Sequence, residues 1–109
     1  MRVQRHPTAS GVRLVLTGSD ALDFANAEAV KAASLAAVRD AAEAVIDLSE
    51  VEFVDSAGIG VLVALYRAMR TRGARARYCG VRPGVRSVLE IIRLDQILEI
   101  VDDPREVSR

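Results

Sequence analysis

The chain has 109 residues, which is enough for one domain and too few for two independent cores. Half of the residues are apolar but only 4% are aromatic, so the core must consist mainly of aliphatic side chains, as in a sheet covered by helices. Fifteen basic residues balance fifteen acidic residues, which excludes a global electrostatic attraction to nucleic acid or to an anionic membrane. We expect a single cytoplasmic domain over residues 1–109, with a core over about residues 12–102 and flexible termini.

The N-terminal half predicts strands that alternate with one helix. Residues 12–17 are rich in branched apolar side chains and end at Gly18, which is typical of a strand followed by a turn. After a short polar segment, Asn26 precedes an Ala-rich helix whose apolar face would comprise Ala29, Val30, Ala33, Ala37 and Val38. Residues 44–48 and 53–54 are short apolar runs, so they favour strands over helices.

The C-terminal half predicts two helices and two strands. Residues 56–72 have helical spacing and end at Gly73, with an expected inward face of Ile59, Leu62, Val63, Tyr66 and Met69 or Arg70. Residues 74–80 alternate as a strand, and residues 97–101 form the last candidate strand. Between them, Pro83 suits the start of a helix whose inward side chains would be Val85, Val88, Leu89 and Ile92. With a possible extra strand at residues 1–3, this order predicts an α/β fold with parallel pairing and crossover helices.

Ser56 stands where a strand passes into a helix, in the segment FVDSAGIG over residues 53–60. A serine here suits the N-cap of the helix, where its hydroxyl would accept a hydrogen bond from an unpaired N–H. The alternative is an exposed signalling residue, because a phosphate on Ser56 would place nearly two negative charges beside Asp55. The fold should survive that charge, whereas an interface closed over the same spot should not.

Gly58 and Gly60 each cost about 1 kcal/mol relative to Ala inside a helix, so another requirement must favour them. Either they let a partner's backbone approach closely, or they let this helix lie tight against the sheet.

The segment over residues 58–63 also partly mimics a dinucleotide-binding fingerprint. Val63 stands at the third glycine position, however, and no acidic residue stands in a suitable place after the next strand, which argues against a nucleotide site.

The sequence shows no carrier of enzymatic chemistry, so we expect no catalytic residue, metal or cofactor. The only histidine, His6, lies in the expected flexible terminus, and the acidic residues have no catalytic or metal-binding spacing. The only cysteine, Cys79, fits a buried strand position and cannot form an intramolecular disulfide. Five arginines are interpreted as a solvated face rather than a nucleic-acid site: Arg67, Arg70, Arg72, Arg75 and Arg77.

Over about residues 12–102 the sequence resembles a STAS domain, the family shared by sulphate transporters and bacterial anti-sigma factor antagonists. The resemblance rests on Thr17-Gly18 followed by Asp23, on VIDLS at residues 45–49, on FVDSAGIGVL at residues 53–62, and on Gly73 with the helix over residues 83–93. It implies a mixed sheet of four or five strands with helices packed mainly on one face, and a phosphorylatable serine at Ser56. The partner-binding residues that it implies are Asp23, Asp55, Ser56, Ala57, Gly58, Ile59 and Gly60.

Free-standing relatives of this kind bind an anti-sigma factor when unmodified, and so release a sigma factor for transcription. The resemblance therefore implies two partners: an anti-sigma factor whose serine kinase activity phosphorylates Ser56 to end the interaction, and a phosphatase that resets it. ATP would belong to the kinase. Two features depart from the usual pattern: the turn over residues 18–23 is two residues longer than the usual Gly-Glu-Leu-Asp, and Ala57 replaces a second serine.

Two other functions fit a small domain of this family. One is an accessory subunit of a lipid-transporting ABC system, in which the face around Ser56 would hold an ATPase subunit permanently. The other is a scaffold subunit of a large stress-sensing assembly. The anti-sigma factor antagonist is our first hypothesis, because it gives the lone hydroxyl of the motif a role.

Overall fold

A five-stranded sheet with the order β1-β2-β4-β6-β7 forms the centre of the computed structural model, which describes residues 1–102. The strands are β1 (Arg2–Pro7), β2 (Val12–Thr17), β4 (Glu43–Asp47), β6 (Arg75–Cys79) and β7 (Glu99–Val101). β1 pairs with β2 in antiparallel fashion, whereas the other three pairs are parallel. The predicted α/β fold with a mixed sheet is therefore confirmed.

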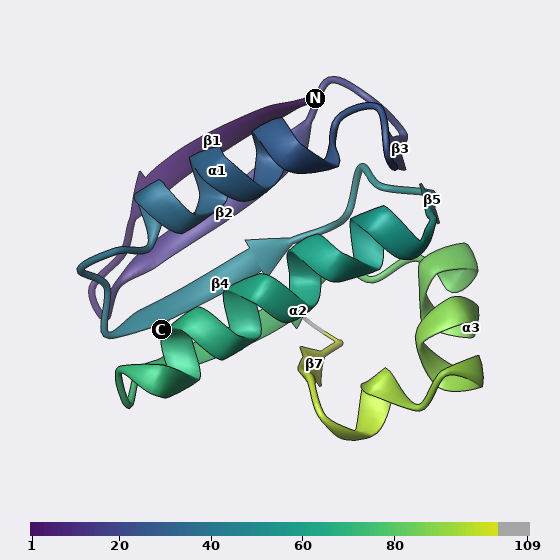
Figure 1. Ribbon diagram of the computed structural model, residues 1–109. Helices are drawn as coiled ribbons and strands as arrows, with labels where there is room; N and C mark the ends of the chain where they lie inside the picture. Colours follow the sequence, from purple (N-terminus) through teal and green to yellow (C-terminus); the bar gives the residue numbers. More distant parts are fainter. Residues whose placement is uncertain (103–109) are drawn as a thin grey trace.

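Helices supply the crossovers that the parallel strands require. α1 (Ala27–Ala37) and α2 (Ser56–Thr71) lie side by side on one face of the sheet (Figure 1). α3 (Pro83–Ile91) and the short 3₁₀ helix η1 (Leu94–Gln96) connect β6 to β7. None of the helices over residues 1–102 is long and apolar enough to cross a membrane.

A second, two-stranded sheet links the segments that precede α1 and α2. β3 (Ala21–Leu22) pairs in parallel with β5 (Phe53–Val54), with Ala21 opposite Phe53 and Leu22 opposite Val54. The sequence predicted the strand at residues 53–54 but treated residues 18–23 as irregular, because two residues are too few to show a period. This pairing brings the starts of both helices to the same end of the molecule (Figure 1).

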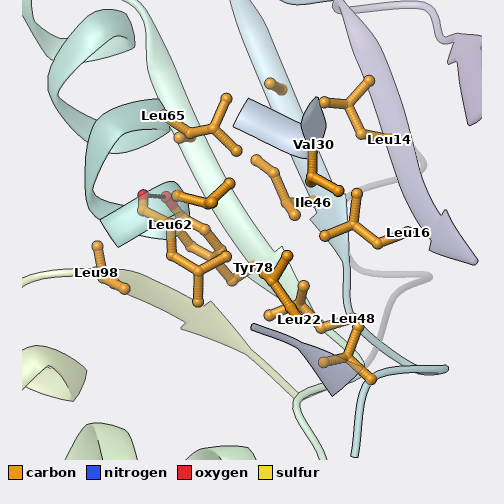
Figure 2. Packing of buried hydrophobic residues seen from close by; sticks show 14 of the residues in the cluster. Leu14, Leu16, Leu22, Val30, Ile46, Leu48, Leu62, Leu65, Tyr78 and Leu98 are labelled. Carbon is orange, nitrogen blue, oxygen red and sulfur yellow. Dashed lines mark hydrogen bonds between the residues drawn. The ribbon is translucent and has the colours of Figure 1, made fainter. Parts of the chain in front are cut away.

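The core lies between the large sheet and the two helices. Alternate residues of the central strands point into it, and Figure 2 shows Leu14, Ile46 and Tyr78 packed against side chains of α1 and α2. The Tyr78 hydroxyl donates a hydrogen bond of 2.7 Å to the carbonyl of Leu62, which satisfies the polar end of this buried ring.

The opposite face of the sheet carries charged side chains instead of helices. Arg13 pairs with Asp47, while Glu99 lies 2.6 Å from Arg75 and 3.3 Å from Arg77. The aliphatic Val45 and the thiol of Cys79 are buried in the same face, which confirms the expected strand position of the cysteine.

The five arginines do not form the single solvated face that the sequence suggested. Arg72 donates to the carbonyls of Val38 and Ala41, each at 2.9 Å, and so caps the C-terminal end of α1. Arg75 and Arg77 belong to the charged face of the sheet, and only Arg67 and Arg70 remain on the exposed side of α2. Arg72, Arg75 and Arg77 lie apart from the other two because they contact distant segments, and the spacing of residues in the sequence does not reveal such contacts.

The inward faces of the helices agree with the predicted ones only in part. α1 buries Ala27, Val30 and Ser34, and leaves Ala29 and Ala33 exposed. Alanine costs little on either side of a helix, so an Ala-rich run does not fix the orientation of its face. The buried residues of α2 are Gly58, Val61, Leu62, Leu65 and Met69, and those of α3 are Val85 and Leu89. Ile92, which was expected to point inward, is 47% exposed.

The N-terminus forms a complete strand where the sequence predicted a flexible terminus with at most three paired residues. β1 pairs with all six residues of β2, and Val3 packs against the core. The sequence did not predict the full length of β1, because most side chains of this edge strand are exposed and the alternation of polar and apolar residues is weak. The frayed tail expected at the other end falls on residues 103–109, outside the described residues.

Candidate functional site

Ser56 is the first residue of α2 and is exposed. The preceding residue, Asp55, has an extended backbone and is the N-cap, since its Oδ1 accepts a hydrogen bond of 2.9 Å from the N–H of Gly58. The prediction that Ser56 caps the helix is therefore wrong by one residue. Asp and Ser are almost equally good caps, so the sequence could not rank the two neighbours. The helix does not depend on the Ser56 hydroxyl.

Asp55 also holds the loop that precedes α1. Its second oxygen, Oδ2, accepts a hydrogen bond of 3.0 Å from the N–H of Phe24. The hydrogen bond from Gly58 first, and that from Phe24 next, hold the pKa of Asp55 below its usual value, so this carboxylate is ionised at neutral pH. One side chain thus fixes both the start of α2 and the position of the loop.

Hydrogen bonds within the loop itself place Asp23 at the same corner. The Asp23 carboxylate accepts from the N–H of Ala25 at 3.0 Å, and the Asn26 side chain accepts from the N–H of Asp23 at 3.0 Å. The Asn26 amide also donates to the carbonyl of Ala21 at 2.8 Å, which ties the loop to β3. The longer turn over residues 18–23 therefore still leads Asp23 next to the residues that surround Ser56.

Phe24 is the residue of this corner that the sequence reasoning missed. Phe24 is 81% exposed, although its backbone N–H is held by Asp55. An exposed aromatic ring beside Ser56 gives this corner an apolar group that a partner can contact. The available signal was an aromatic residue beside Asp23 in a chain with only four aromatics, but the contact between Phe24 and Asp55 is not local in sequence.

The two glycines of α2 answer different requirements. A Cβ atom at Gly58 would lie 2.1 Å from the carbonyl oxygen of Leu22, so this glycine lets the helix pack against β3. A Cβ atom at Gly60 would meet nothing within 4 Å, and the residue is exposed. Packing explains Gly58 and does not explain Gly60.

A hollow of about 230 Å³ between α1 and α2 adjoins this corner. Ala57 and Gly60 line it from α2, and Ala27, Glu28 and Lys31 line it from α1. Asp23, Phe24, Ser56, Ala57 and Gly60 together form what we name the Ser56 surface. Of the other predicted site residues, Gly58 is buried, Ile59 is half-buried against the core, and Asp55 anchors the surface from within.

A family model described as Mlab, STAS domain matches residues 3–101. The chain belongs to the STAS domain family. An anti-sigma F factor antagonist of Paenibacillus polymyxa is 32% identical over 59 residues, which cover 54% of this STAS chain and 50% of that protein. An anti-sigma-B factor antagonist of Listeria monocytogenes is 33% identical over 63 residues, which cover 58% and 55% respectively. The chain thus spans about half the length of the curated relatives it matches.

The STAS fold also appears in solved structures. An anti-sigma-factor antagonist (STAS) domain protein from Planctomyces limnophilus superposes with a TM-score of 0.88 and covers 97% of this chain and 94% of that one. The identity is 22%, so this likeness concerns the fold. It confirms the arrangement of sheet and helices that the resemblance implied.

Proposed function

We propose that this STAS domain is an anti-sigma factor antagonist that binds an anti-sigma factor through the Ser56 surface and releases it when Ser56 is phosphorylated. The observation that carries the proposal is the exposed position of Ser56 in the first turn of α2, beside the loop of Phe24. The names of the relatives from Paenibacillus polymyxa and Listeria monocytogenes support the same role. The domain would act by binding, and ATP would belong to the kinase activity of its partner.

The composition of the Ser56 surface suits an interface. The exposed ring of Phe24 can enter an apolar pocket of a partner, and buried aromatic anchors often supply much of the binding free energy. Gly60 and Ala57 present little side chain, so a partner's backbone can come close to the first turns of α2. Ser56 would then lie within the covered area.

Phosphorylation would change the charge of this surface without changing the fold. Ser56 neither caps α2 nor lies in the core, and negative charge is favourable at a helix N-terminus. Both oxygens of Asp55 already accept backbone hydrogen bonds, so the phosphate would lie beside an ionised carboxylate. Under a bound partner that charge would lose its water, and a loss of about 4 kcal/mol corresponds to about a thousandfold weaker binding.

Substitutions at Ser56 test the proposal by titration calorimetry with a purified anti-sigma factor of the source organism. Ser56→Ala is expected to bind as the unmodified protein does, and Ser56→Asp at least a hundredfold more weakly. Ser87→Asp is the matched control, because Ser87 is exposed on α3 outside the Ser56 surface, and it should bind normally. Equal affinity of Ser56→Ala and Ser56→Asp would reject the switch. Binding of an ATPase subunit regardless of the charge at Ser56 would instead support the ABC-system alternative.

Incubation with ATP and the anti-sigma factor gives an independent measurement. We expect one phosphate on the wild-type chain, located at Ser56 by peptide mapping, and none on Ser56→Ala. Phosphate at another residue, with Ser56 unmodified, would contradict the assignment.

A further inference from the structure

A second hollow, of about 270 Å³, lies where the C-terminal half of α2 passes β6 and β7. Tyr66 and Arg70 line it from α2, Arg75 and Glu99 from the strands, and Ile97 from the segment before β7. Arg70 is about 20 Å from Ser56 along the helix axis, so this hollow is separate from the Ser56 surface.

Arg70 supplies an uncompensated positive charge at this hollow. Its Nη1 donates a hydrogen bond of 2.6 Å to the Tyr66 hydroxyl, and its guanidinium lies 5.8 Å from the centre of the Tyr66 ring. Over residues 1–102, no carboxylate lies within ion-pair distance of Arg70. The nearby acid, Glu99, accepts two hydrogen bonds from Arg75, at 2.8 and 2.6 Å, and is thereby already neutralised.

The donors around Arg70 match a carboxylate. A guanidinium has five N–H groups in a plane, so several remain after the bond to Tyr66, and the hydroxyl of Tyr66 keeps its own proton to donate. The end of α2 would oppose an anion, but the carbonyl oxygens of Met69 and Arg70 already accept hydrogen bonds from Ala74 and Gly73. The opposing partial charge is therefore reduced.

The rest of the lining is apolar. Ile97 is 56% exposed beside the hollow, and Ala74 and Ala76 also line it. An exposed isoleucine next to an unpaired arginine suits a ligand with one anionic head and an aliphatic chain. At about 30 Å³ for each water, the volume corresponds to about nine non-hydrogen atoms.

We propose that this hollow binds a small aliphatic monocarboxylate. The carboxylate accepts hydrogen bonds from the Arg70 guanidinium and the Tyr66 hydroxyl, and the alkyl chain packs against Ile97. One unpaired cation matches one negative charge, which favours a monocarboxylate over a phosphate dianion. The proposal is independent of the role of Ser56.

Hexanoate is the probe, titrated into the full ¹⁵N-labelled chain and followed by NMR. Saturable shifts are expected at the amides of residues 66–76 and 97–99, with a dissociation constant in the millimolar range or below. Hexan-1-ol lacks the charge and inorganic phosphate lacks the chain, so each should bind at least tenfold more weakly. Shifts that do not saturate, or equal binding of hexan-1-ol, would overturn the proposal.

Matched variants identify the residue responsible. Arg70→Gln should weaken hexanoate binding at least tenfold, whereas Arg67→Gln should leave it unchanged, because Arg67 is exposed on the same helix but does not line the hollow. Arg70 is exposed, so the thermal midpoint of Arg70→Gln should stay close to that of the wild type and the loss can be read as lost binding. Ser56→Asp should also bind hexanoate normally. Equal affinity of Arg70→Gln and the wild type would remove the basis for the site.

Discussion

Replacing each glycine of α2 by alanine should have opposite effects on stability. Gly60→Ala adds a methyl group in open space within a helix, so it should raise the free energy of unfolding by up to about 1 kcal/mol. Gly58→Ala gains the same helix propensity but places its Cβ 2.1 Å from the carbonyl oxygen and 2.9 Å from the carbonyl carbon of Leu22. Relief requires β3 to move by about 1 Å, and such overpacking costs typically 1–3 kcal/mol. The clash is with backbone, so the cost should lie near the upper end of this range, and after the gain of about 1 kcal/mol in helix propensity a net loss of about 2 kcal/mol remains.

Urea unfolding followed by circular dichroism measures both changes. The midpoint should rise for Gly60→Ala and fall for Gly58→Ala, with the dependence of the free energy on urea unchanged in both variants. If Gly58→Ala were as stable as Gly60→Ala, the close approach of α2 to β3 would be wrong. The pair also separates folding from binding: Gly60→Ala should bind the anti-sigma factor more weakly although it is more stable, because its methyl group projects from the Ser56 surface.

Three further predictions concern buried polar groups. Ser34→Ala should raise the free energy of unfolding by about 1 kcal/mol, since the Ser34 hydroxyl is buried without a hydrogen-bond partner in the described chain; a loss of stability in urea would indicate a missed partner. Burial opposes ionisation of Asp47, but hydrogen bonds from Ser49 and the ion pair with Arg13 outweigh this effect and lower the pKa of Asp47 below 3.8. The ionised carboxylate therefore stabilises the fold above about pH 4, and this stabilisation is lost as the pH falls through the pKa of the folded state. Asp47→Asn should therefore cost about 1–3 kcal/mol at pH 7 and less at pH 3, and a difference independent of pH would contradict this assignment. Burial first, and the Asp47 carboxylate next, raise the pKa of the Cys79 thiol to about 11. Iodoacetamide at pH 8 should therefore modify Cys79 only after unfolding. Rapid labelling of the native chain would refute the burial of this thiol.

The order of the elements and the position of Ser56 at the start of a helix were predictable because both depend on local patterns. Branched apolar runs predicted the strands at residues 12–17 and 44–48, and helical spacing predicted α2. The small residues that follow Asp55 pointed to Ser56, and the exposure of that residue satisfies the main structural requirement of the switch. These features involve neighbours in sequence, which a pattern can report.

The missed features depend on contacts between distant segments. The two-residue strand β3 exists because it pairs with β5, and Phe24 belongs to the Ser56 surface because Asp55 binds its N–H. Asp55 and Ser56 were equally acceptable caps, so only the folded backbone could assign the cap to Asp55. The face of α1 was ambiguous for the same kind of reason, since its alanines are tolerated inside and outside.

If the Ser56 surface binds a partner as proposed, the residues around Asp55 fall into two groups, those that support the fold and those that are free to vary. Asp55 and Gly58 support the architecture, so most replacements there should damage folding. The ring of Phe24 and the bare position at Gly60 hold nothing in place within residues 1–102. Substitutions that change the size, charge or shape of the side chain at these two positions should therefore alter the specificity for a partner and leave the fold intact.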